Sequence, residues 1–215
     1  MRESGRPTQA PDALLRAALK NQYHATLAML RTAIRRYPDE LWTGGRGHAN
    51  PPWRIAYHTL YYAHWYLQAD SRRMPLWTRH RRGIRLLNRP ASTGRPYTKA
   101  ELLALWDVCD SAVDDAVDAL DLGSPRSGFS WYPISKAEHQ LVNLRHIQYH
   151  QAQLADRLRR ATGVGINWER GRPRSRVAGR TGAARVKRRV PSRIAAHERV
   201  AQGPHAEAVS PTRRI

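Results

Sequence analysis

Residues 53–67 read WRIAYHTLYYAHWYL, a run in which apolar and aromatic side chains cover almost the whole circumference of a helix. Pro51 and Pro52 come directly before it, and proline is favoured in the first turn of a helix. A helix that is apolar on most sides is buried on most sides. This segment therefore predicts the central helix of a helical bundle.

Apolar spacing and end signals predict three further helices. The first covers residues 11–37 and ends at Pro38. The other two cover residues 98–123 and 135–162, and each opens with a capping-box pattern, a hydroxyl residue followed three positions later by glutamate. Gly163 ends the last one. Since no alternating pattern indicates a sheet, we predict an all-α fold.

The wheel positions of apolar residues predict which sides of these helices face the core. For the first helix the predicted inward residues are Leu14, Ala18, Leu27, Leu30 and Ile34. For the last helix they are Leu141, Leu144, Ile147, Leu154 and Leu158.

A connection of roughly thirty residues, 69–97, joins the second and third predicted helices. This is long for a compact domain unless the connection has structure or function of its own. Residues 77–87 are the candidate for a short extra helix. A long crossover lets the helices on its two sides run parallel, so the bundle need not run up-down-up-down.

The C-terminal part of the chain differs in composition from the rest. Residues 169–215 contain no Phe, Trp, Tyr or Leu, so they cannot bury a core, and we predict a disordered basic tail. Residues 163–215 carry 13 Lys and Arg against 3 Asp and Glu, within a net charge of +20 for the chain. We therefore predict a flexible N-terminus (1–10), a four-helix bundle (11–168) and the tail (169–215).

Such a charge leaves open a basic, non-enzymatic module that binds nucleic acid or another polyanion, because basic patches neutralise phosphates. We favour this alternative less, since nearly all the basic residues are arginine, which a GC-rich genome encodes by default. The single cysteine, Cys109, excludes an internal disulfide and fits a reducing cytoplasm. Without a signal-peptide pattern or a membrane span, we expect a cytoplasmic protein with no membrane partner.

Ten histidines are present, and only His146 and His150 have the four-residue spacing that places two imidazoles on adjacent turns of one helix face. Asn143 shares that face, at the edge of the predicted core. On the segment 53–67, His58 and His64 lie about 120° apart on the wheel, so they cannot serve one small site together. Periodicity does not choose between them.

Two strings of the sequence resemble the DinB-like family: NPPWRIAYHTLYY (50–62) and EHQLVNLRHIQYHQAQL (138–154). The resemblance covers residues 12–168, with an Arg-rich stretch at 79–89 and the basic tail as departures. It implies a four-helix bundle with a long crossover between helices two and three. It also implies a divalent-metal site in which one histidine of helix two and an H-x-x-x-H pair of helix four are ligands. The matching positions form a histidine triad: His58, His146 and His150.

The family includes thiol-dependent S-transferases and maleylpyruvate isomerase-like proteins, and the resemblance therefore implies metal-dependent chemistry on a small-molecule substrate. Three neutral imidazoles would leave one position of a zinc ion open for water or a low-molecular-weight thiol. We expect zinc, with nickel or iron as alternatives, and a thiol transferase or hydrolase if the protein is an enzyme. Asn143 is a candidate to orient a ligand or contact the substrate, with a packing role as the equal alternative. A homodimer is compatible with all of this.

Aspartates at helical spacing on the third predicted helix raise the alternative of a di-iron carboxylate bundle. Such sites need Glu-x-x-His motifs on two helices, and the chain has none. We therefore interpret this acidic stripe as a solvated face: Asp107, Asp110, Asp114, Asp118 and Asp121.

Overall fold

A computed structural model describes residues 9–44, 49–73, 77–81, 83–88 and 94–171. Within these residues there are helices and no strands, which confirms the all-α prediction. The helices are α1 (Gln9–Arg36), α2 (Asp39–Trp42), α3 (Pro52–Tyr66), α4 (Lys99–Ser111), α5 (Val113–Ala119) and α6 (Lys136–Thr162). None of the helices in the described ranges has both the length and the apolar character that a membrane span requires.

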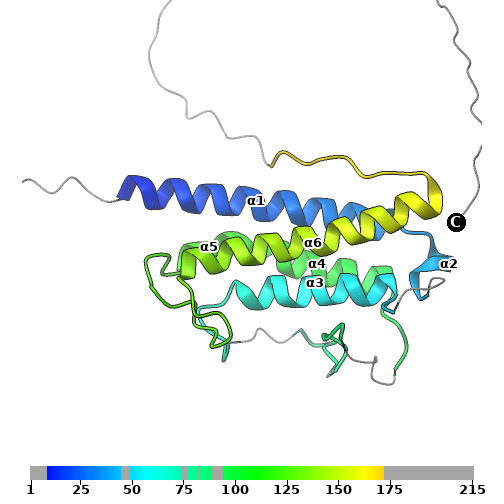
Figure 1. Ribbon diagram of the computed structural model, residues 1–215, viewed down its shortest axis with the longest axis horizontal. Coiled ribbons are helices and arrows are strands. Elements are labelled where there is room, and N and C mark those ends of the chain that lie inside the picture. Colours follow the sequence, from blue (N-terminus) through cyan, green and yellow to red (C-terminus); the bar gives the residue numbers. More distant parts are fainter. Residues whose placement is uncertain (1–8, 45–48, 74–76, 82, 89–93, 172–215) are drawn as a thin grey trace, which may run out of the picture. The chain divides into compact units, whose positions relative to one another are not determined.

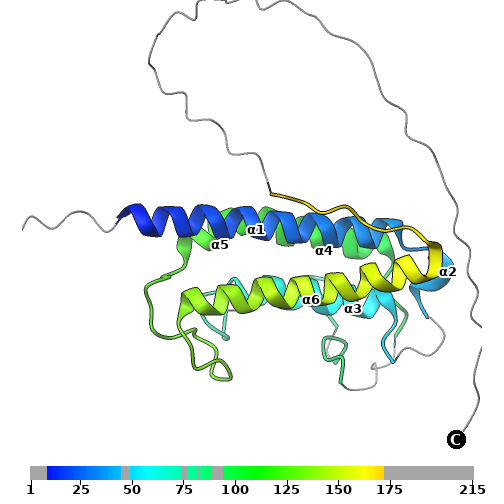
Figure 2. The same ribbon diagram turned by 45° about the horizontal axis from the view of Figure 1, so that its top comes forward.

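The long helices lie side by side, and their chains run in two opposite directions (Figures 1 and 2). Helices α1 and α6 run one way, while α3 and the pair α4–α5 run the other way. Helices α3 and α4 are therefore parallel. This is the arrangement that the long connection between them was predicted to allow.

The core lies between these helices, and its fully buried residues come from all of the long ones. Helix α3 is buried along almost its whole length, as its apolar circumference predicts. It packs mainly against α6 and α4, and the crossover covers a further side through the buried Ile84. The apolar surface of α3 is therefore covered partly by the crossover and not by helices alone.

The inward side of α6 differs from the predicted one. Leu141 is 58% exposed, whereas the polar residues Gln140 and Asn143 are completely buried. Their side-chain amides donate hydrogen bonds to the backbone carbonyls of Tyr66 (3.2 Å) and Ala63 (3.0 Å), at the C-terminal end of α3. A wheel drawn from hydrophobicity alone therefore misplaces the buried arc, because buried amides with partners belong to it.

The start of α1 also differs. Leu14 is 62% exposed and Ala18 is exposed too, because α1 begins to pack only from Leu19 onward. The helix starts at Gln9, so residues 9 and 10 of the predicted flexible N-terminus are helical, and residues 1–8 lie outside the described residues.

Three other predicted segments are a short helix in the connection, the third long helix and the basic tail. Among the described residues of 77–87 there are turns and no helix, so the extra helix predicted there is wrong. The predicted helix 98–123 is interrupted at Ala112, which separates α4 from α5. Of the basic tail, residues 172–215 lie outside the described residues, and its disorder stays a prediction.

The acidic stripe on α4–α5 is only partly solvated. Asp110 and Asp114 both contact the imidazole of His24 on α1, at 2.7 and 3.1 Å. Asp118, although exposed, pairs with Lys20 of α1 at 2.6 Å. Part of the stripe therefore faces basic residues of α1 and helps to join α1 to α4 and α5.

The N-terminus of α4 has a complete capping box, in which the hydroxyl of Thr98 accepts from the N–H of Glu101 and the carboxylate of Glu101 accepts from the N–H of Thr98. At α6 the hydroxyl of Ser135 accepts from the N–H of Glu138. The Glu101 carboxylate also pairs with Arg95 at 2.6 Å. The hydrogen bonds from Arg95 and Thr98 lower the pKa of Glu101 to about 2.

We expect Glu101→Gln to remove a pH-dependent part of the stability while keeping the cap, because a glutamine also accepts from the N-cap N–H. A carboxyl whose pKa is lower in the folded than in the unfolded chain stabilises the fold above its unfolded pKa, about 4.3. That contribution is lost as the pH falls towards 2. Urea unfolding should show a difference between wild type and variant at pH 7 that closes below pH 4. A difference that is the same at every pH would contradict the assignment.

Candidate metal centre

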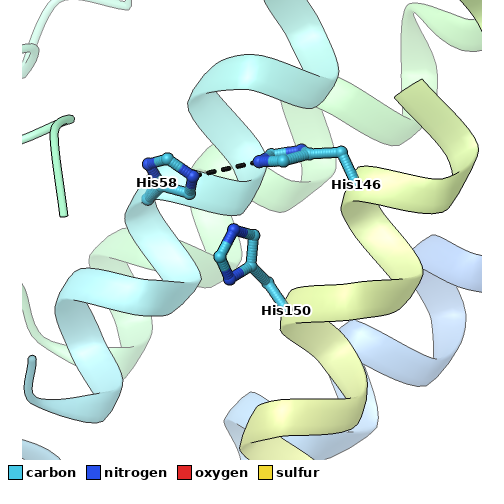
Figure 3. Close-up of side chains that lie close together, drawn as sticks. All are labelled: His58, His146 and His150. Atoms are coloured by element: carbon cyan, nitrogen blue, oxygen red, sulfur yellow. Dashed lines mark hydrogen bonds between the residues drawn. The ribbon is translucent and has the colours of Figure 1, made fainter. Parts of the chain in front are cut away.

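Helices α3 and α6 bring three histidines together. His58 comes from α3, and His146 and His150 come from adjacent turns of α6. Their rings face one common space (Figure 3), and one ligand atom of each lies within 4.8 Å of those of the other two. Within the described ranges this is the only such group of three or more potential metal-binding side chains. The three residues therefore lie close enough to bind one metal ion.

The Nδ1 atom of His58 lies 2.5 Å from the backbone carbonyl oxygen of Arg85. A carbonyl oxygen can only accept, so the proton of the neutral imidazole sits on Nδ1, and the lone pair of Nε2 faces the other two histidines. Histidines that bind metals commonly donate their second ring N–H to a carbonyl or a carboxylate, which fixes both tautomer and ring orientation. His58 has this arrangement.

The crossover is attached to α3 and to the residues just before it by three side chains spaced four residues apart. Each of them donates to a backbone carbonyl in residues 84–87: Asn50 Nδ2 to Leu87 O (3.0 Å), Arg54 Nη2 to Leu86 O (2.5 Å) and His58 Nδ1 to Arg85 O (2.5 Å). The Arg-rich connection thus supplies a partner to one of the histidines. Sequence analysis missed it because a backbone carbonyl has no residue-type signal, and only the length of the connection pointed to a role.

The other two histidines are oriented differently. The Nδ1 atom of His150 lies 3.3 Å from the side-chain oxygen of Gln153, three residues further along α6, which leaves its Nε2 for a metal. The ring of His146 packs edge-on against those of Tyr62 and Tyr66. Its Nε2 lies 3.0 Å from the Nε2 of His58. Gln153 was also missed, although its helical spacing from His150 is a signal that could have found it.

The distance between the facing nitrogens of His58 and His146 is compatible with one shared metal ion. Two imidazole nitrogens that bind one zinc at 2.0–2.1 Å lie about 3.3 Å apart, close to the 3.0 Å between the facing Nε2 atoms of His58 and His146. Burial lowers the pKa of His58 to about 4 and that of His146 to about 3, and it also lowers the pKa of His150. All three imidazoles are therefore neutral at pH 7, the form in which they bind metals.

Other residues considered from the sequence lie elsewhere. His64 is buried on α3 but does not belong to the three-histidine group, so it is His58 that lies with the pair on α6. Asn143 joins α6 to α3 through its bond to Ala63, and its role towards a ligand or substrate stays a prediction. Cys109 is buried, and burial raises the pKa of its thiol, as expected of a core residue.

Comparison of the chain with protein-family models, with curated proteins and with solved structures found no match. The functional interpretation therefore depends on the motifs quoted above and on the geometry of the three histidines.

Proposed function

We propose that the protein is a DinB-like metal protein that binds one divalent ion, zinc by preference, through His58, His146 and His150. The observation that carries the proposal is the convergence of three neutral imidazoles from two helices, with the Nε2 of His58 directed at the group by the carbonyl of Arg85. Nickel and iron are the alternatives, since imidazole also binds these metals.

The chemistry that we propose is that of a transferase or hydrolase acting on a small molecule. Three protein ligands leave one position of a tetrahedral zinc for another group, as in catalytic rather than structural sites. A metal bound by the three histidines would act as a Lewis acid, and it would lower the pKa of a water molecule or a low-molecular-weight thiol at the open position. The protein's own part is to hold the three imidazoles in place and to shape the space beside them. The alternative of a polyanion-binding module concerns mainly residues outside the described ones, and no described contact favours it.

The test is the zinc content and zinc affinity of the untagged full chain, with His64→Ala as the matched control. Loss of a partner that only orients a metal-binding histidine costs 10–100-fold in affinity, so loss of a ligand itself should cost more than about 100-fold. We expect this loss for His58→Ala and for His150→Ala, while His64→Ala, also a buried histidine of α3, keeps the wild-type affinity. Equal zinc binding by wild type and both site variants would overturn the proposal, as would an equal loss in His64→Ala. Circular dichroism checks that each variant is folded.

A further inference from the structure

A cavity of about 480 Å³ lies beside the three histidines, and His58 and His146 form part of its wall. This is within the usual size of sites for small molecules. Arg85 of the crossover lies on another part of the wall. The rest is aromatic, from α3 and from the loop before α6: Tyr62, Trp65, Tyr66, Trp131 and Tyr132.

The aromatic residues present a surface suited to a flat ligand. The ring centroids of Trp65 and Trp131 lie 5.5 Å apart, and those of Tyr62 and Trp65 lie 5.9 Å apart. Trp131 is nevertheless 48% exposed, which is unusual for so large an apolar side chain with aromatic neighbours. Aromatic rings stack offset or edge-to-face on other rings, so this wall favours a ligand with a ring or a conjugated chain.

The charge on the wall selects the sign of the ligand. Of the residues that the structure places there, Arg85 is the only one with a full charge at neutral pH, and none is acidic. A cation would gain from the aromatic rings but would be repelled by the guanidinium and by a metal at the histidines. An anion is attracted by both.

Arg85 also has unused hydrogen-bonding capacity. Its guanidinium lies 5.6 Å from the centre of the Tyr61 ring and bonds to Tyr62, but its Nε has no partner in the structure. The planar fork of a guanidinium matches the two oxygens of a carboxylate.

We propose that this cavity binds a small aromatic carboxylic acid, with its carboxylate at Arg85 and its ring against Trp65 and Trp131, as the substrate class of the metal site. The role as a substrate rests on the proposed metal function, whereas binding of the acid can be tested without metal. Arg85 of the crossover would then have two roles: its backbone carbonyl orients His58, and its side chain selects the ligand.

The test is calorimetric titration of the full chain with 2-naphthoate, once with a chelator and once with zinc. We expect binding in both conditions. In the chelated protein, Arg85→Gln should weaken it at least about tenfold, because glutamine keeps the backbone carbonyl but loses the charge. Arg145→Gln, at an exposed residue next to His146 and outside this cavity, is the matched control and should bind as wild type does.

Two further probes test the sign of the charge on the unchanged protein. The neutral 2-naphthamide and the cationic 2-naphthylmethylamine should each bind wild type at least about tenfold more weakly than 2-naphthoate. Trp131→Ala should weaken all three while keeping the preference for the acid. These comparisons remain decisive if Arg85→Gln does not fold.

The proposal is overturned if 2-naphthoate does not bind with or without zinc, if acid and amide bind equally, or if Arg85→Gln binds the acid as tightly as wild type. These outcomes are distinct from failure of the metal function, which shows as unchanged zinc binding in His58→Ala. Binding of 2-naphthoate to the chelated protein tests whether the cavity is a site for the acid, whether or not the histidines bind zinc.

Discussion

Gly128→Ala is expected to lower the free energy of unfolding by more than about 3 kcal/mol, the sum of two costs. Gly128 has a φ of +83°, where an alanine is strained by 1–2 kcal/mol. A Cβ there would also lie 2.2 Å from the carbonyl oxygen of Ala69 and 2.9 Å from the Cα of Asp70. Both are backbone atoms, so the chain itself would have to move.

The close approach at Gly128 joins three parts of the fold. The N–H of Ser71, just beyond the end of α3, donates to the carbonyl of Gly128 at 3.0 Å. The buried ammonium group of Lys136, at the start of α6, donates to the carbonyl of Ala69 at 2.8 Å and to that of Ser127. The same loop carries Trp131 to the cavity beside the histidines. Displacing it should therefore weaken ligand binding as well as stability.

Gly163→Ala is the matched control for Gly128→Ala. Gly163 ends α6 with a φ of +73°, but a Cβ there would meet nothing within 4 Å. This variant should lose only the strain of the left-handed conformation, about 1–2 kcal/mol. Urea unfolding of both variants at pH 7 gives the comparison, and equal losses would show that the contact at Gly128 costs nothing.

Local signals account for the part of the fold that the sequence could predict. Pro51 and Pro52 mark the start of α3, Thr98 with Glu101 marks that of α4, and Gly163 marks the end of α6. Each of these depends on residues within one turn of the boundary, which is why a pattern can detect it. The break between α4 and α5 at Ala112 has no proline or glycine beside it, so no sequence pattern predicted it.

The site could be predicted only in part, for a related reason. The spacing of His146 and His150 indicates a shared helix face. The choice of His58 over His64 needed the resemblance to the DinB-like family, because both histidines have largely apolar neighbours on the same helix. What the structure adds is long-range: the carbonyl of Arg85 at Nδ1 of His58, and the cavity between α3, the crossover and the loop before α6. Contacts to backbone atoms 27 residues away leave no periodicity in the sequence.

Zinc is expected to stabilise the folded protein strongly, because only the folded chain brings His58 near His146, 88 residues further along. A ligand that binds the folded state alone stabilises it by RT ln(1 + [L]/Kd), about 4.1 kcal/mol at a thousand times Kd. For a domain of this size that corresponds to a rise of about 8–16 °C in Tm. Differential scanning calorimetry of chelated and zinc-loaded protein measures it directly.

The variants show whether the stabilisation comes from this site and from both of its helices. His58→Ala leaves the pair on α6 intact, and two histidines on one helix cannot tie α6 to α3, so zinc should raise its Tm by much less than that of wild type. His64→Ala should show the full rise in Tm on zinc binding. Its starting Tm should be lower than that of wild type, because the substitution removes a buried imidazole. A full rise in His58→Ala would mean that zinc binds elsewhere in the chain. Because a metal held between α3 and α6 must be released before these helices separate, the wild-type stabilisation should also slow unfolding, and the zinc dependence of the unfolding rate should disappear with His58.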